Sequence, residues 1–171
     1  SRFIYFVSEK LKINQKNIKS FVLGGHGDSM VAMLNHTFVN GEPIKNLIES
    51  NKISQNEISE IVDRTKKGGA EIVKYLEKGS AFYAPAAAGV EMAESFLKNQ
   101  KKELPCAVHL NGEYGFKDIY AGVPVIIGSQ GVEKVVQLDL SKEEKENFIK
   151  SINSVKELFN AAIKIDKNLE N

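Results

Sequence analysis

The histidine at position 26 is the residue of this sequence best suited to chemistry, because glycines enclose it in the stretch GGHGDSM. A histidine is the side chain best able to take or give a proton near neutral pH. Glycines on both sides leave room for a substrate to reach the ring and permit backbone angles that other residues avoid. The same pattern also fits an exposed histidine in a flexible loop, with Asp28 capping the turn. The loop alone leaves both interpretations open.

Arg2 is the second candidate, since the only arginines of the chain are Arg2 and Arg64. A guanidinium can hold a carboxylate through two parallel hydrogen bonds, whereas a lysine offers a point charge. A solvated position on a helix is the alternative for Arg2. For Arg64, which lies beside Asp63 on the polar side of its helix, that alternative is favoured.

The other motifs give little support for a metal or a nucleotide site. His36 and His109 lie in extended or apolar segments, which favours packed or surface roles for both. The sequence contains no H-E-x-x-H and no C-x-x-C, so it offers no zinc pattern. It also contains neither a G-x-x-x-x-G-K-[ST] phosphate loop nor a G-x-G-x-x-G dinucleotide fingerprint.

The composition predicts one compact domain, because 171 residues that are 42% hydrophobic suffice for a core. Lys plus Arg (23) nearly balances Asp plus Glu (22), so no strong field would attract nucleic acid or a membrane surface. The single Cys106 cannot form an internal disulfide, and no apolar run has the length needed to span a bilayer. We therefore expect a cytoplasmic protein with small-molecule or protein partners.

The elements that must position Arg2 and His26 are helices and short strands. The first segment has a helical apolar rhythm, and a short strand at 21–23 delivers the glycine loop. An extended stretch at 30–39 then reaches Asn40-Gly41, a dipeptide that favours a type I′ hairpin turn.

Two capping boxes, Ser54 with Glu57 and Ser141 with Glu144, predict the starts of two long helices. The first of these contains Gly68-Gly69 in its interior, which costs roughly 1 kcal/mol per glycine and points to a packing reason such as a close helix crossing. A further helix should begin near Pro85.

Three apolar stretches at 105–110, 119–127 and 132–140, separated by glycine turns, predict an antiparallel meander. Pro124 within it favours an edge or a bulge. Because helices and strands do not follow a repeated βαβ order, we expect an α+β fold with mixed or antiparallel sheets and long packed helices.

Four stretches match one protein family in order and spacing, and the match as a whole runs over essentially the entire chain. They are SRFIYF, FVLGGHGDSMV, RTKKGGAEIVKYLEKGSAFYAPAAA and LPCAVHLNGEYGFKDIYAGVPVIIGSQGVEKVVQLDL. They resemble the C-terminal half of NAD-dependent malate dehydrogenases of the lactate-dehydrogenase-like type. The resemblance implies the fold of that domain.

The resemblance also implies roles for five residues. His26 occupies the place of the catalytic histidine, which accepts the hydroxyl proton when malate is oxidised to oxaloacetate and returns it in the reverse reaction. Arg2 falls where the family keeps an arginine that holds the substrate carboxylate. Ser80 and Ala81 match substrate-side positions and Pro85 a wall of the nicotinamide pocket, although packing at a helix start explains these three equally well.

On the same basis we expect 1–171 to be a single substrate-binding and catalytic domain that is inactive alone. The N-terminus, without an initiator methionine, looks cut. The Rossmann domain that binds most of the NAD, the loop that closes over substrate and the aspartate that orients the histidine would all precede Ser1. The complete enzyme would be a homo-dimer or homo-tetramer that acts on a small dicarboxylate in the tricarboxylic acid cycle, with no bound metal.

Two alternatives stay open. A lactate dehydrogenase shares this fold and histidine, and the residue that best separates the two substrates belongs to the closing loop; the stretch GSAFYAPAAA favours malate. The other alternative is a non-catalytic oligomerisation domain, against which the intact His26 and Arg2 argue.

Overall fold

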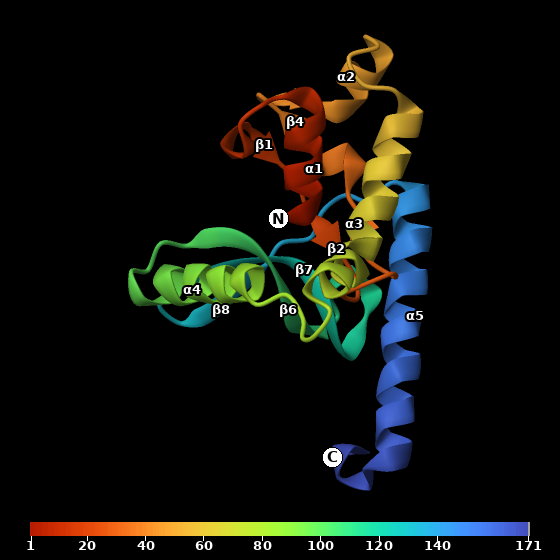
Figure 1. Ribbon diagram of the computed structural model, residues 1–171. Coiled ribbons are helices and arrows are strands. Elements are labelled where there is room, and N and C mark those ends of the chain that lie inside the picture. Colours follow the sequence, from red (N-terminus) through yellow and green to blue (C-terminus); the bar gives the residue numbers. More distant parts are fainter. Residues whose placement is uncertain (171) are drawn as a thin grey trace.

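The computed structural model describes residues 1–170, in which five α-helices surround three antiparallel sheets (Figure 1). The helices are α1 (Arg2–Leu11), α2 (Ile44–Glu49), α3 (Gln55–Leu76), α4 (Tyr83–Leu97) and α5 (Lys142–Ile165). The strands are β1 (Ile18–Lys19), β2 (Val22–Leu23), β3 (Val31–Ala32), β4 (Phe38–Val39), β5 (Glu42–Pro43), β6 (Lys102–Asn111), β7 (Lys117–Gly128) and β8 (Gly131–Val135). Short 3₁₀ turns are η1 (Gln15–Asn17), η2 (Leu34–His36), η3 (Glu113–Gly115) and η4 (Lys167–Glu170). The expected α+β class is confirmed.

Local sequence signals form the elements that they predict. The Ser54 hydroxyl accepts a hydrogen bond from the Glu57 amide, and the Glu57 carboxylate accepts one from the Ser54 amide, so a capping box starts α3. The same reciprocal pair starts α5. Asn40 and Gly41 both have positive φ, at 52° and 80°, which is the type I′ turn between β4 and β5. Among the helices of residues 1–170, none has both the length and the apolar composition needed to cross a bilayer.

The largest sheet is the predicted antiparallel meander, with β7 in the centre between β6 and β8. Two details differ from the expectation. The last strand ends at Val135 rather than at residue 140. Pro124 lies in the central strand, opposite Pro105 of β6.

Pro124 is tolerated in β7 because of the direction of its backbone groups. Its carbonyl accepts a hydrogen bond from Val136, on the β8 side and just past the end of that strand. The nitrogen of the same residue faces the same side of the ladder, so the missing N–H removes no bond to β6. The position where β8 ends therefore makes room for this proline.

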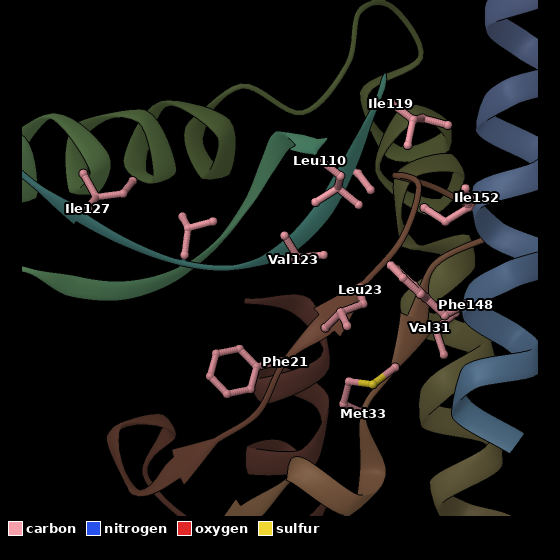
Figure 2. Packing of buried hydrophobic residues seen from close by; sticks show 12 residues of the cluster. Phe21, Leu23, Val31, Met33, Leu110, Ile119, Val123, Ile127, Phe148 and Ile152 are labelled. Atoms are coloured by element: carbon pink, nitrogen blue, oxygen red, sulfur yellow. The ribbon is translucent and has the colours of Figure 1, made fainter. Parts of the chain in front are cut away.

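The buried side chains form two clusters. The first lies between the large sheet, β2, β3 and α5 (Figure 2). Its members are Phe21, Leu23, Val31, Met33, Leu110, Ile119, Ala121, Val123, Val125, Ile127, Phe148 and Ile152. The second lies between α1, α2, α3 and the small sheet of β1, β4 and β5. Its members are Phe3, Phe6, Val7, Ile18, Val39, Ile44, Leu47, Ile53, Ile58 and Ile61.

Strand β2 lies at the boundary of the two clusters. Because side chains alternate along a strand, Val22 packs against the second cluster while Leu23 belongs to the first. The glycine loop that follows is thus carried to the junction of both cores. Helix α5 contacts this junction with its first half, and its second half extends away from the other elements (Figure 1).

Candidate active site

The loop that carries His26 is fixed on one side by the large sheet. Gly24 and Gly122 of β7 exchange two backbone hydrogen bonds, of 2.8 and 2.9 Å. A Cβ added to Gly122 would lie 2.8 Å from the Gly24 carbonyl oxygen, so the strands approach too closely there for any side chain.

Helix α5 fixes the other side of the loop. The Gly25 amide donates a 2.8 Å hydrogen bond to the hydroxyl of Ser151, which is 1% exposed. A Cβ added to Gly24 would overlap that hydroxyl and would lie 2.8 Å from the Ser151 Cβ. The two glycines before His26 therefore serve contacts with β7 and α5, in addition to the room for a substrate that the sequence suggested.

The imidazole of His26 is exposed at the tip of this fixed loop. The histidines that have hydrogen-bond or ion-pair partners within residues 1–170 are His36 and His109. Asp28, two residues further on, is also exposed and forms no ion pair with His26 in the described part of the chain. The ring is thus available to a substrate, directly after two residues whose backbone is hydrogen-bonded to β7 and to α5.

Arg2 is the first residue of α1, and its side chain lies along α3. One guanidinium nitrogen donates a 3.1 Å hydrogen bond to the backbone carbonyl of Thr65. A Cβ added to Gly68 would lie 2.7 Å from Arg2 Cδ, while one added to Gly69 would be 3.8 Å from the guanidinium. The packing reason expected for these glycines is found at Gly68, where the Arg2 side chain needs the space, and not at Gly69, where 3.8 Å is an ordinary contact distance.

The two arginines have different partners. The exposed Arg64 pairs with Glu71 at 2.9 Å and with Glu9 at 3.7 Å, and its guanidinium lies over the Phe6 ring. This surface role for Arg64 agrees with the sequence-based interpretation. Among residues 1–170, no carboxylate forms an ion pair with Arg2. The hydrogen bond of its guanidinium is to the backbone carbonyl of Thr65. That half-buried guanidinium can accept an anionic ligand.

Three other predicted site residues lie in and after the connection between α3 and α4. Ser80 and Pro85 are exposed and Ala81 is half-buried. Pro85 is the third residue of α4, as the helix-start pattern predicts. Within the described residues, no hydrogen bond joins this segment to Arg2 or to the His26 loop. Its role in binding stays a prediction.

The remaining histidines have structural partners. The His36 Nε2 lies 2.7 Å from the Asp139 carbonyl, and the His109 ring packs edge-on against Tyr120. No three His, Cys, Asp or Glu side chains in residues 1–170 are grouped so that they could hold a metal ion.

Two tertiary contacts of α5 could not be found in the sequence. Ser151 contacts a loop 126 residues away, and no local pattern indicates that pairing. Glu144, besides capping α5, accepts hydrogen bonds from the Asn35 amide at 3.2 Å and from the Asn35 side chain at 3.0 Å. Burial alone would raise the pKa of Glu144, but the hydrogen bonds from Ser141 and Asn35 outweigh it and the pKa falls below the ordinary value.

A cleft of about 580 Å³ lies between α3 and α5, behind the loop. Asp28 and Ser29 contribute to its wall, together with residues of both helices such as Lys66 and Lys150. The lining does not include His26 or Arg2, so the cleft adjoins the candidate site without containing it.

Comparisons with known proteins find relatives in sequence and in fold. A family model described as lactate/malate dehydrogenase, alpha/beta C-terminal domain, matches residues 1–165. The malate dehydrogenase of Pelagibacter ubique (strain HTCC1062) is 59% identical over 169 residues, which are 99% of this chain and 53% of that protein.

Solved structures of two relatives have the same fold. Malate dehydrogenase from Cryptosporidium parvum is 41% identical with a TM-score of 0.89, over 92% of this chain and 50% of the other. Lactate dehydrogenase from Eimeria maxima, solved with NADH and oxamate, is 36% identical with a TM-score of 0.93, over 97% of this chain and 50% of the other. The chain spans about half the length of the relatives that it matches.

Proposed function

The chain belongs to the family of lactate/malate dehydrogenase C-terminal domains, and we propose that residues 1–171 are the substrate-binding and catalytic half of an NAD-dependent malate dehydrogenase. The observation that carries the proposal is the exposed imidazole of His26 on a loop that both β7 and α5 hold in place. The high identity to a malate dehydrogenase supports malate as the substrate.

In the proposed reaction His26 accepts the proton of the substrate hydroxyl and returns it to oxaloacetate in the reverse direction. No hydrogen-bond or ion-pair partner within residues 1–170 covers this ring, so its nitrogens are accessible to the substrate hydroxyl. The hydrogen bonds of Gly24 and Gly25 support a pre-organised orientation of the ring toward the substrate hydroxyl, which lowers the entropic cost of reaching the reactive geometry.

Arg2 holds a carboxylate of the substrate in this proposal. Its guanidinium already donates to the Thr65 carbonyl and is confined by α3 at Gly68, so little side-chain freedom is lost when the carboxylate binds. By holding the carboxylate, the Arg2 guanidinium orients the hydroxyl of the substrate toward His26 in this proposal.

NAD is the cofactor that the proposal requires, and when bound it takes up or supplies the hydride of the reaction. The small side chains of the exposed Ser80 and Pro85 and of the half-buried Ala81 fit a wall against a flat ring. No stretch of the chain fits the diphosphate, since the sequence has no glycine fingerprint for it. We therefore assign residues 1–171 a part of the substrate and nicotinamide pocket, and most of the cofactor contacts to residues outside them.

Compartment and assembly form part of the same proposal. The free thiol of Cys106, the only cysteine, supports work in the reducing cytoplasm, where malate oxidation belongs to the tricarboxylic acid cycle. Exposed apolar side chains on α4 and α5, including Tyr83, Leu97 and Leu158, support a homo-dimer or homo-tetramer. Sedimentation velocity of the full-length protein measures that state directly.

Substrate preference is the test of the proposed function. The full-length protein that contains this chain should oxidise NADH with oxaloacetate at least tenfold more efficiently, in kcat/KM, than with pyruvate, which corresponds to about 1.4 kcal/mol. A preference for pyruvate would make it a lactate dehydrogenase, the second candidate that the similarity to the Eimeria enzyme supports. If the protein reduces neither oxaloacetate nor pyruvate, the alternative of a non-catalytic oligomerisation domain is favoured.

A further inference from the structure

Ser151 is a polar residue in the buried apolar face of α5. It is 1% exposed, next to Ile152 and one turn from Phe148, both of which point into the first cluster (Figure 2). A hydroxyl in such a place loses its hydration, and this loss is unfavourable unless a hydrogen bond replaces it. The partner of the Ser151 hydroxyl is the Gly25 amide, immediately before His26.

Two other serines within helices, Ser59 and Ser154, behave differently, whereas the buried Ser95 of α4 resembles Ser151 in bonding outside its own helix, to the Ile127 carbonyl of β7 at 2.7 Å. The hydroxyls of Ser59 and Ser154 bond to backbone carbonyls four residues earlier, in their own helices. This local bond is the usual one for a serine within a helix. In the described chain, the Ser151 hydroxyl accepts its hydrogen bond from the Gly25 amide. The Ser151 hydroxyl thus stabilises the loop before His26 rather than the backbone of its own helix.

Gly24 and Gly25 pack closely against α5 on this side of the loop. Gly24 has a positive φ of 91° and no space for a Cβ beside Ser151, and a Cβ on Gly25 would lie 2.9 Å from Val155 Cγ2. With Gly24 paired to Gly122 on the opposite side, the backbone that leads to His26 lies between β7 and α5.

From these contacts we propose that Ser151 is a positioning residue for proton transfer. Its hydroxyl fixes the Gly25 peptide and through it the direction of the His26 imidazole. The inference rests on the proposed function, because a defined direction of the ring matters only if the ring exchanges a proton with a substrate. It adds a residue of α5, far from the substrate contacts in sequence, to the reaction.

The test compares Ser151→Ala with Ser154→Ala in the full-length enzyme. Ser154 is the matched control because it lies on the same helix and its hydroxyl bonds only within that helix in the described chain. Ser151→Ala should lower kcat about tenfold, since small misplacements of a catalytic group are costly, and should change KM for oxaloacetate less than about twofold. Ser154→Ala should leave both constants unchanged.

Hydrogen exchange of the Gly25 amide supplies a readout that does not depend on activity. The amide should be protected in the wild-type protein and should exchange at least about tenfold faster in Ser151→Ala, because its acceptor is gone. An unprotected Gly25 amide in the wild-type protein overturns the proposal even if Ser151→Ala does not fold.

The kinetic outcomes separate the two hypotheses. Unchanged kcat in folded Ser151→Ala, or equal losses in both variants, overturns the positioning role while a wild-type rate with oxaloacetate still supports the proposed function. A wild-type protein without activity on oxaloacetate or pyruvate overturns the proposed function, and with it the role of Ser151 in proton transfer.

Discussion

Arg2 and Gly68 are in direct contact across the α1–α3 crossing: the position of a Cβ on Gly68 is 2.7 Å from Arg2 Cδ and 3.3 Å from a guanidinium nitrogen. A glycine in the middle of a helix is about 1 kcal/mol less favourable than alanine, so the helix is weakened at a position where the arginine needs space. The contact determines where the guanidinium points. A residue in the interior of α3 therefore affects the position of the guanidinium that we propose binds the substrate carboxylate.

Gly68→Ala should displace the guanidinium and raise KM for oxaloacetate about three- to tenfold, with a smaller effect on kcat. Gly69→Ala is the matched control, because its added Cβ would be at an ordinary contact distance of 3.8 Å from Arg2. Both variants gain about the same helix propensity, but only in Gly68→Ala is this gain offset by displacement of the Arg2 side chain that bonds to Thr65, so Gly68→Ala should be the less stable of the two. Equal KM values in the two variants would contradict this account.

Arg2→Lys tests whether the guanidinium of Arg2 binds the substrate carboxylate through two hydrogen bonds. Lysine keeps the positive charge but cannot form two parallel hydrogen bonds to a carboxylate, so KM for oxaloacetate should rise about tenfold or more. Arg64→Lys serves as the control, since Arg64 already pairs with Glu71 and Glu9 on the surface. If steady-state kinetics give the same KM for Arg2→Lys and wild type, Arg2 does not bind the carboxylate.

His26→Asn tests the proton transfer. Asparagine is polar and of similar size but cannot take up the proton, so kcat should fall by about 10² to 10⁴-fold. Binding of NADH, followed by its fluorescence, should stay within about twofold of wild type because His26 is assigned no cofactor contact. Near-normal turnover would remove His26 from the proposed role. His36→Asn, whose ring contacts the Asp139 carbonyl, provides a control for histidine loss elsewhere.

How far the sequence predicted this structure depends on the range of each interaction. The capping boxes at Ser54 and Ser141 and the turn at Asn40-Gly41 involve residues within four positions, and all three formed as expected. The three strands of the meander were predicted in the right order, because their apolar runs are bounded by glycine turns, although the last one ends at Val135 rather than at residue 140.

Contacts between distant segments could not be predicted in this way. The pairing of Gly24 with Gly122 and the hydrogen bond from Gly25 to Ser151 depend on the packing of α5 and β7 around β2. The tolerance of Pro124 in a central strand likewise depends on where β8 ends. For the site, the sequence and its resemblance named His26 and Arg2, but not the residues that hold them.

The Glu144 carboxylate predicts how stability depends on pH. Its pKa is lowered from 4.5 in the folded protein, where burial is outweighed by hydrogen bonds from Ser141 and Asn35. A group with a lowered folded pKa stabilises above its unfolded pKa, and this contribution is lost as the pH falls through the folded value. Glu144→Gln should therefore lower the free energy of unfolding at pH 7 by about 1 to 2 kcal/mol, and this loss should shrink as the pH falls from the ordinary carboxyl pKa through the lower folded value.

Glu143→Gln is the control for this pH dependence. Glu143 lies in the same first turn of α5 but is exposed, so its loss shares the change in helix-dipole interaction and not the bonds to Asn35. A difference between the two variants that does not diminish on acidification would contradict the assignment to Glu144.

Two phenylalanines on α5 test whether this helix is anchored only in its first half. Phe148 is 1% exposed and packs against the rings of Tyr114 and Phe116, with centroids at 5.3 and 5.7 Å, whereas Phe159 is 51% exposed. Phe148→Ala should lower the free energy of unfolding by about 3 to 5 kcal/mol. Phe159→Ala, with the same chemical change, should lower it by no more than about 0.5 kcal/mol.

The same pair of variants connects the anchor of α5 to the site. Phe148 lies one turn before Ser151, so a folded Phe148→Ala protein should also show a lower kcat, because the helix no longer holds Ser151 against Gly25. Phe159→Ala should keep the wild-type kcat. Denaturant titrations and steady-state kinetics on the full-length protein measure both effects. A large loss of stability in Phe159→Ala would instead mean that the second half of α5 packs against another surface in the full-length protein, and that its anchor is not confined to the first cluster.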